Sequence, residues 1–357
     1  MTSRDIINMR LHNQQLSAAT FSRPADLVSW MGAIQAQDYA GAKWALANRL
    51  KNPVESEIDK ALNDGEILRT HVLRPTWHFV SPRDIRWMLQ LTEPRISAFC
   101  AKHFRDLQLD NSILKRSNNV IARALEEGQH LTKTEIGDAL RKAGIETEDL
   151  RLTFIIIRAE LDQLICNGAR RGKQFTYALL EQRAPNSKRL HKDEALSELA
   201  KRYFTSRGPA TVRDFTWWSG LSNIDARSAT ENIKSQLSVE VVKEQTYLFM
   251  PSGKDPVKGS RVLLLPPWDE YTVAYKDRSL VIDPEFEKEA GHGIFNSNIV
   301  VNGYLKGSWR RELKGHSLEF ESRYFSPPPK TLLQKVTSTA KLYAKFLEKD
   351  LILKKTS

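Results

Sequence analysis

The chain has 357 residues, of which 41% are hydrophobic and 27% charged, and its formal net charge is +11. This length and composition exclude a largely disordered chain and allow two to four domains with well-buried cores. The two cysteines, Cys100 and Cys166, are far apart and belong to no CxxC pair, which argues against a zinc or disulfide framework and predicts buried thiols in a reducing compartment.

The basic charge balance has two interpretations. It either keeps a globular surface soluble or attracts a polyanion, most often nucleic acid. The first residues contain no apolar signal segment, and runs such as FIIIRAEL are much shorter than the roughly 20 residues that span a bilayer. We therefore expect a cytoplasmic, nucleoid-associated protein with no membrane segment.

The first predicted unit covers residues 1–110. The segments IINMRLHNQQL and ADLVSWMGAIQAQ predict two amphipathic helices, and AGAKWALANRL predicts a third. The run ILRTHVLRPTWHFV, residues 67–80, predicts a hairpin-like pair of strands. Helices followed by a β-hairpin form the pattern that recurs along the chain.

The second predicted unit, residues 111–190, shows this pattern most clearly. Thr132 and Glu135 have the spacing of a capping box, and Gly144 is placed to end the helix. The segment LRLTFIIIRAELDQLICNG predicts a longer helix, and ARRGKQFTYALLEQR predicts a basic hairpin that turns at residues 171–173. Helix, turn, helix and hairpin is the plan of a winged-helix module.

The remaining chain predicts a third such unit over residues 191–257 and a β-rich domain over residues 258–357. In the third unit, Pro209 and Gly220 bracket the helix of RGPATVRDFTWWSGL. In the last domain, Asn302-Gly303 is a strong hairpin signal, and a lysine-rich amphipathic helix closes the chain. The predicted fold class is α+β, with three tandem winged-helix motifs, a small β domain and a C-terminal helix.

Two glutamines, Gln35 and Gln37, stand at the end of the second predicted helix. Residues two apart on a helix do not share a face, and a glutamine amide is costly to bury because it needs several hydrogen-bond partners. Spacing alone favours amides that cap or bridge helices. Catalysis is the alternative if the helix ends here and both side chains turn to one cleft.

Five segments in order then identify a resemblance: QAQ, THVLRPTWHFV, RGPATVRDFTWWSGL, LLPPWDEYTVAYKDRS and NGYLKGSWRR. Together they resemble the AlkZ-type winged-helix DNA glycosylases, a family that includes an enzyme that unhooks interstrand crosslinks. The resemblance implies a concave, DNA-wrapping shape and hydrolysis of the N-glycosidic bond of alkylated purines such as N7-alkylguanine. It also implies that the family's catalytic Gln-apolar-Gln motif falls on Gln35, Ala36 and Gln37.

This chemistry is reasonable for amide side chains. An N7-alkylated guanine is already cationic and leaves as a neutral base, so an enzyme has mainly to orient a water and to stabilise a positively charged sugar. We expect a monofunctional glycosylase, a monomer without cofactor or metal, which acts on double-stranded DNA with alkylated or crosslinked purines. The alternative is a winged-helix DNA-binding protein or regulator without catalysis.

Other residues are expected to line the cleft or to bind DNA. Asp38 is interpreted as a helix N-cap, with a general base as the alternative, and Lys43 as a phosphate contact. Asp269 is expected to be buried and paired with an arginine, and Trp217 and Trp218 to pack in the core. The remaining candidates for the cleft or for phosphate contacts are Arg74, Thr76, His78, Arg170, Arg171, Lys173, Arg278, Arg310 and Arg311.

Overall fold

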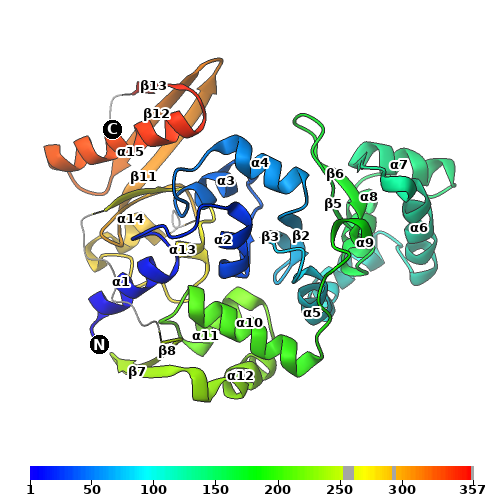
Figure 1. The fold of residues 1–357 in the computed structure, drawn as a ribbon, viewed down its shortest axis with the longest axis horizontal. Coiled ribbons are helices and arrows are strands. Elements are labelled where there is room, and N and C mark those ends of the chain that lie inside the picture. The colour runs from blue at the N-terminus through cyan, green and yellow to red at the C-terminus, as the bar shows by residue number, and fades with distance from the viewer. Residues whose placement is uncertain (252–260, 292–294, 355–357) are drawn as a thin grey trace.

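The computed structural model describes residues 1–251, 261–291 and 295–354, and its helices and four sheets give an α+β fold (Figure 1). In this description the first sheet belongs to a group of elements with the order α2 (Pro24–Met31), β1 (Ala33–Gln35), α3 (Tyr39–Ala47), α4 (Glu55–Asn63), β2 (Leu68–Val72) and β3 (Thr76–Val80). Its strand order is β1-β3-β2, and β1 is therefore an edge strand. The predicted hairpin of residues 67–80 is confirmed.

A second group of elements repeats this order at the far side of the molecule. It consists of α6 (Asn111–Ala124), β4 (Leu131–Thr132), α7 (Lys133–Lys142), α8 (Arg151–Leu161), β5 (Ile165–Asn167), β6 (Thr176–Leu179) and α9 (Leu180–Arg183). The sheet order, β4-β6-β5, matches that of the first group. The predicted capping box of Thr132 and Glu135 is present. The long helix predicted from residue 150 ends earlier than expected, because its last residues form β5.

A third group contains α10 (Lys192–Ser206), α11 (Val212–Ser219), α12 (Asn223–Asn232), β7 (Ser238–Val242) and β8 (Gln245–Phe249). Ala210 forms an isolated bridge to Leu248 of β8, in the place of a first strand. As predicted, Gly220 ends α11, with a φ of 68° that suits glycine. The long helix α5 (Ile85–Asp106) joins the first group to the second.

The C-terminal part is a five-stranded sheet of order β13-β12-β11-β10-β9, covered by α15 (Lys330–Phe346). Its other elements are β9 (Val262–Leu265), α13 (Glu270–Val273), α14 (Glu287–Gly291), β10 (Asn298–Val301), β11 (Tyr304–Lys314), β12 (Ser317–Tyr324) and β13 (Asp350–Leu353). The Asn302-Gly303 turn joins β10 to β11 as predicted, whereas the segment after Trp268 is the short helix α13 and not a strand.

The cores show how the parts are joined. One apolar cluster unites β2 and α5 with α10, α11 and Tyr275, and a second packs α2 and α3 against α15 and the C-terminal sheet. The first group is therefore enclosed by two neighbours. The helix α1 (Ser3–Asn13), which the sequence assigned to the first unit, packs through Ile7 and Leu11 against Tyr271 and the C-terminal strands. The predicted boundary at residue 258 lies outside the described residues.

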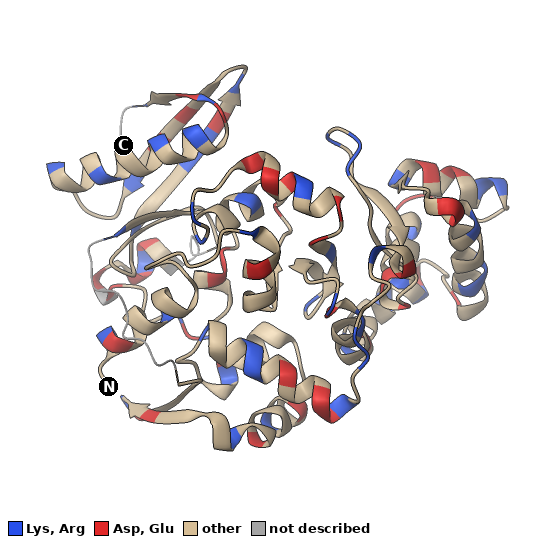
Figure 2. Cartoon of the chain, in the orientation of Figure 1, with Lys and Arg blue, Asp and Glu red and all other residues tan. Residues whose placement is uncertain are grey.

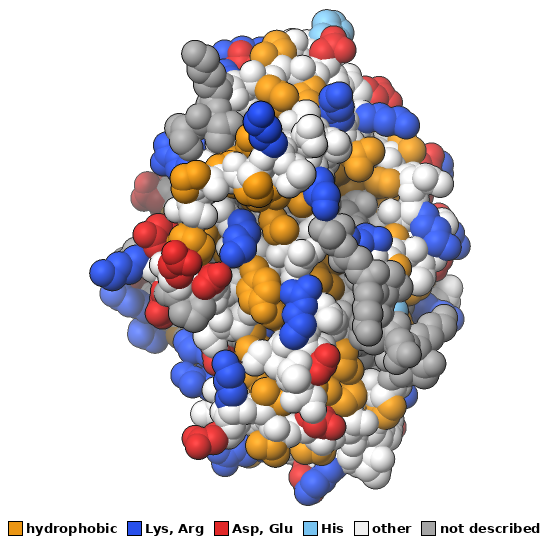
Figure 3. All heavy atoms as spheres, turned by 90° about the vertical axis from the view of Figure 1, so that its left-hand side faces the viewer, with side chains coloured by type: hydrophobic (Ala, Val, Ile, Leu, Met, Phe, Trp, Pro, Cys, Tyr) orange, Lys and Arg blue, Asp and Glu red, His pale blue; other side chains and the backbone are white. Residues whose placement is uncertain are grey.

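Charge is distributed over the whole molecule. Lys and Arg occur on every part of the chain, including the loop between β5 and β6 (Figure 2). On the face shown in Figure 3, cationic side chains are spread among apolar and acidic ones and form no single patch. Both cysteines are buried, as predicted. Within the described residues, no helix combines the length and the apolar character of a membrane span.

Candidate active site

Gln35 is the last residue of the strand β1, and Gln37 lies just beyond it in the connection to α3. Neither glutamine belongs to a helix, which corrects the predicted secondary structure. The helix α2 ends at Met31, and Gly32 follows with a φ of 73°, a backbone conformation that glycine adopts without strain. In β1, Gln35 then pairs with His78, and the N–H of Ala36 extends the pairing with a 2.7 Å bond to the carbonyl of Trp77. Because β1 ends at Gln35, Gln37 lies outside the regular alternation of strand side chains.

Gln35 is held at both its backbone and its side chain. It is 7% exposed, its N–H donates to Oε1 of Glu270 at 2.9 Å, and its own Oε1 accepts a hydrogen bond from Nη2 of Arg74 at 2.9 Å. Because a guanidinium only donates, this contact fixes which end of the amide is oxygen. The amide nitrogen therefore points away from Arg74.

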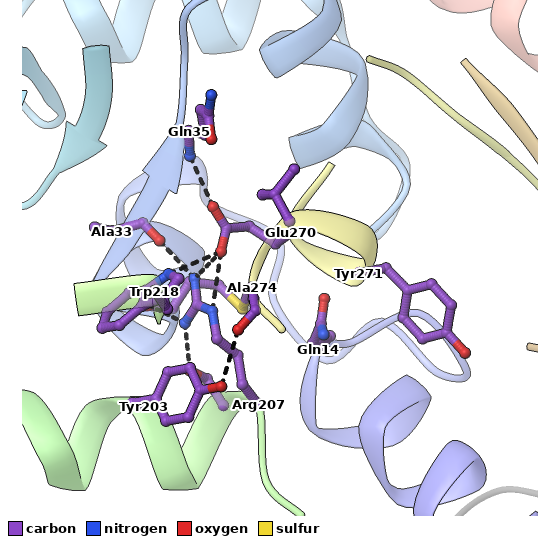
Figure 4. Close-up of polar contacts among 12 residues, drawn as sticks. Gln14, Ala33, Gln35, Tyr203, Arg207, Trp218, Glu270, Tyr271 and Ala274 are labelled. Carbon is purple, nitrogen blue, oxygen red and sulfur yellow. Dashed lines mark hydrogen bonds and ion pairs between the residues drawn. The ribbon is translucent and has the colours of Figure 1, made fainter. Parts of the chain in front are cut away.

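Glu270 is the centre of the buried network behind Gln35 (Figure 4). Its Oε2 accepts from Nη2 of Arg207 at 2.6 Å and from Nε1 of Trp218 at 3.1 Å, and all three side chains are buried. Arg207 also donates to the carbonyl of Ala33 at 2.6 Å, which ties the network to β1. Burial alone would raise the pKa of Glu270, but the Arg207 charge and the Gln35 N–H outweigh it and lower the pKa. Glu270 is thus an ionised acceptor.

Gln37 is exposed, in contrast to Gln35. Its Oε1 accepts from the N–H of Trp77 at 3.3 Å, and its side chain lines a groove of about 600 Å³ together with Arg69, Trp77 and Phe175. The two amides therefore face different surroundings, one inside a hydrogen-bonded network and one at an open groove.

His78 lies directly across the sheet from Gln35. Burial, and next the charge of Arg74, lower the pKa of His78 to about 3, so the ring is neutral at physiological pH. Its Nδ1 lies 2.9 Å from the carbonyl of Thr76 and donates to it. The other ring nitrogen and the Thr76 hydroxyl are buried without a hydrogen-bond partner among the described residues. His78 is therefore suited to hydrogen bonding and not to proton donation.

Arg74 places positive charge beside the Gln35 amide, and the charge of Arg278 lies near that of Arg74. The pKa of each guanidinium is lowered by burial first, and the charge of Arg74 lowers the pKa of Arg278 further. Nε of Arg278 donates to the carbonyl of Thr272 at 2.8 Å, and its Cζ lies 5.4 Å from the ring centroid of Trp217. Two cations that disfavour each other in this way favour an anionic ligand between or near them.

A comparison with known families now decides the class of protein. A family model described as "DNA glycosylase AlkZ-like" matches residues 28–346. The chain belongs to the AlkZ-like DNA glycosylase family. It is accordingly a DNA glycosylase.

Two individual proteins extend this comparison. The chain is 24% identical over 327 residues to the "interstrand DNA cross-link repair glycosylase" of Streptomyces sahachiroi, which covers 86% of this chain and 87% of the relative. Its fold matches the solved structure of the S. sahachiroi DNA glycosylase AlkZ with a TM-score of 0.81 and 21% identity, over 99% of this chain and 100% of the other. At this identity the solved structure supports the fold alone.

In this AlkZ-like glycosylase, the prediction that Asp269 is buried and paired with an arginine is confirmed, and the arginine is Arg49. Two hydrogen bonds of 2.7 and 2.8 Å join them, and both side chains are buried. Asp38 does occupy the N-cap position of α3, but its side chain makes no capping hydrogen bond. Lys43 is buried against Glu55 at 2.7 Å and Asp59 at 2.9 Å. Its charge is already neutralised, so the geometry does not support the expected phosphate contact.

The remaining predicted basic residues lie in the β5–β6 loop and on β11. In the β5–β6 loop, Arg170 pairs with Asp59 at 3.3 Å and Arg171 with Glu135 at 2.7 Å, whereas Lys173 is exposed and lines the groove of Gln37. On β11, Arg310 is exposed and Arg311 lies over the ring of Tyr343, 5.3 Å from its centroid. Because strand residues alternate, these two arginines serve opposite faces of the sheet.

The tryptophans follow the prediction of a structural role. Trp218 is fully buried, and Trp217 is half-buried with its Nε1 bonded to the carbonyl of Val273 at 2.9 Å. The sequence analysis missed Arg207 and the importance of Glu270. The acidic pair of WDEY was the available signal, since two adjacent carboxylates in an apolar segment each require a buried cation.

Proposed function

We propose that this enzyme is a monofunctional DNA glycosylase that hydrolyses the N-glycosidic bond of cationic alkylated purines, N7-alkylguanine among them. Its substrate range includes interstrand crosslinks through such purines, in line with the name of the S. sahachiroi relative. The observation that carries the proposal is the pair of amides at the C-terminal end of β1, of which Gln35 is fixed by Arg74 and Glu270 while Gln37 faces an open groove.

The described geometry supports a simple mechanism. The cationic purine departs without strong acid catalysis. Glu270 and His78 are not suited to protonate the departing base, because Glu270 already accepts hydrogen bonds from several donors and His78 is neutral. Each amide oxygen has a second lone pair besides the one that accepts from Arg74 or from the Trp77 N–H. In the proposed mechanism these lone pairs orient the attacking water and face the positive charge that develops on the sugar. The buried polar atoms of Thr76 and His78, on the Gln35 side of the sheet, offer further hydrogen bonds to water or sugar.

The three groups of elements support a tandem winged-helix arrangement. Each has two helices ahead of a β-hairpin and a first strand or bridge that pairs with the last strand, the topology of a winged helix. We propose units over residues 1–110, 111–190 and 191–257 and a β domain over 258–357, which together hold duplex DNA in a concave surface. Among the predicted basic residues, Lys173, Arg278 and Arg310 are placed best for phosphate contacts.

The test is base release from duplex DNA that carries N7-methylguanine. We expect the wild type to release the base, and Gln35→Ala and Gln37→Ala to lower the single-turnover rate roughly 100-fold while affinity for DNA changes little. Gln334→Ala, an exposed glutamine on α15, is the matched control. Equal release by the two motif variants would move the chemistry elsewhere, and tight DNA binding without release from methylated or crosslinked duplexes would favour a non-catalytic protein.

A second experiment addresses the monofunctional character. A lyase needs an amine nucleophile, and Lys43, the nearest lysine along the chain, is held by two carboxylates. We expect an intact abasic product and no covalent complex after borohydride reduction. A borohydride-trapped complex on DNA would show that the enzyme also cuts the strand by lyase chemistry.

A further inference from the structure

The groove at Gln37 extends well beyond the two glutamines. It lies between the β2–β3 hairpin of the first unit and α7, α8 and β6 of the second, and its volume of about 600 Å³ is that of a small-ligand site. Its lining includes three cations and three aromatic rings and contains no Asp or Glu. These six residues are Arg69, Lys133, Lys173, Trp77, Phe175 and Tyr177.

The inner wall of this groove is a stack of flat groups. The guanidinium of Arg69 lies 4.1 Å from the ring centroid of Trp77 and 4.5 Å from that of Phe175, and its Nε donates to the carbonyl of Ala36 at 3.1 Å. The ring centroid of His71 also lies 4.0 Å from that of Trp77, with the two planes tilted by 43°, and His71 is held by a 2.6 Å contact with Glu160. The stack therefore starts at the main chain of the Gln-Ala-Gln motif and is braced from α8.

The three cations of the groove form no salt bridge with a carboxylate among the described residues, although the charge of the buried Glu160 acts on Arg69. Burial lowers the pKa of Arg69 to about 10, and Arg69 makes no salt bridge with a described residue. Lys133 bonds only the Thr153 hydroxyl, at 2.7 Å, among the described contacts, and Lys173 is exposed in the β5–β6 loop. The three cations outnumber the one nearby carboxylate, that of Glu160, and the excess of positive charge favours an anionic occupant.

We propose that this groove is a nucleotide subsite that receives an undamaged nucleotide next to the lesion. Its phosphate binds Lys133 and Lys173, and its base lies against Phe175 and the Arg69–Trp77 stack, as unstacked bases do on aromatic and guanidinium planes. The alkylated purine itself fits poorly because it is cationic and the charged side chains that line the groove are Arg69, Lys133 and Lys173. This inference rests on the proposed function, since it places the neighbouring nucleotide relative to the glutamines.

The first test locates the base. A duplex with a tetrahydrofuran abasic analogue carries 5-iodouracil directly beside the analogue, and irradiation of the complex joins the iodouracil to a nearby aromatic side chain. We expect the crosslink on the peptide that contains Phe175 or on that of Trp77. We expect no such crosslink when the iodouracil stands five base pairs away. Crosslinks to other peptides in both duplexes would overturn the subsite.

The second test separates stacking from charge. Phe175→Leu keeps an apolar side chain but removes the ring, and we expect it to weaken binding of the analogue duplex at least fivefold. Lys173→Ala and Lys133→Ala should each lower the slope of log K against log salt by about 0.9. Lys142→Ala, an exposed lysine at the end of α7 away from the groove, should leave the slope unchanged. Wild-type affinity and slope in all three groove variants would contradict the proposal.

Failure of this inference is distinguishable from failure of the proposed function. Binding and crosslinking use an abasic analogue, so neither requires catalysis, whereas base release from N7-methylguanine tests the glutamines directly. A wild type that releases base but shows no groove crosslink keeps the function and loses the subsite. A groove crosslink without any base release would support the nucleotide subsite and contradict the proposed glycosylase reaction.

Discussion

A junction between a strand or an isolated bridge and a helix occurs in each of the three proposed units, and the first junction differs from the other two. In the second unit, Thr132 is both the last residue of β4 and the N-cap of α7, and it forms a capping box with Glu135. In the third, Thr211 forms the same motif with Asp214. In the first, the residues from 36 to 38 separate β1 from α3, and the N-cap Asp38 makes no side-chain capping bond.

At the first junction, a capping box is absent and a contact with a buried ionic network takes its place. A capping box satisfies backbone donors that a helix would otherwise leave open. The first junction lacks that device and instead connects its strand to a buried network of Glu270 and Arg207. The last residue of the first strand also differs in its cross-strand partner: Gln35 pairs with His78 in the first unit, and Thr132 pairs with Thr176 in the second. Departures from local rules of this kind are typical of functional sites.

The largest effect should come from removal of the charge behind the first junction. Glu270→Gln leaves Arg207 as a buried cation without its partner, and we expect the free energy of unfolding to fall by about 3–5 kcal/mol. Chemical denaturation measures this change. Glu285→Gln, an exposed acid of the same domain, is the control and should have no measurable effect. A variant as stable as the wild type would mean that the Glu270–Arg207 ion pair does not stabilise the fold.

A smaller effect concerns the residue opposite Gln35. Since the pKa of His78 is about 3 in the folded protein and roughly 6.5 in an unfolded chain, the unfolded state alone binds the proton between these values. Stability is therefore full above pH 6.5 and falls as the pH decreases, by about 2 kcal/mol at pH 5. His78→Asn should flatten this part of the curve, whereas His316→Asn in an exposed turn should not. Parallel curves for His78→Asn and the wild type would refute the buried neutral ring.

The sequence predicted much of this architecture because its signals are local. The capping box at Thr132, the glycine at residue 220 and the Asn302-Gly303 turn depend on neighbours a few residues apart, and all three are present. The β1 strand was interpreted as helix because three strand residues after a helix are too short for a period to show.

The network behind the glutamines was beyond local reasoning. Glu270 lies 235 residues from Gln35 along the chain, and only the fold brings them together. The sequence did predict that Asp269 needs a buried arginine, since an acid in an apolar segment requires one, but it could not say that Arg49 supplies it. Lys43 was expected to contact a phosphate because the sequence does not show that its two acidic partners, on the next helix α4, pack against it.

A third prediction separates the two arginines near the first junction. Arg74→Met removes the donor that orients the Gln35 amide, and we expect the single-turnover rate to fall about tenfold with little change in affinity for DNA. Arg278→Met, beside it, should weaken binding and lower its salt dependence while the rate at saturation stays the same. Arg74→Lys should recover part of the rate. Identical behaviour of the Arg74 and Arg278 variants would show that Arg74 acts only through its charge.

The smallest effect tests the comparison of the junctions directly. Thr132→Ala and Thr211→Ala each remove a side-chain cap, and we expect each to lower the free energy of unfolding by about 1 kcal/mol. Asp38→Ala occupies the corresponding N-cap of the first unit, where no such bond exists, and should cost much less. Chemical denaturation of the three variants measures the three changes in the free energy of unfolding. An equal loss at Asp38 would mean that its carboxylate stabilises α3 in another way, through the helix dipole or through the nearby charge of Arg311, which its own charge influences.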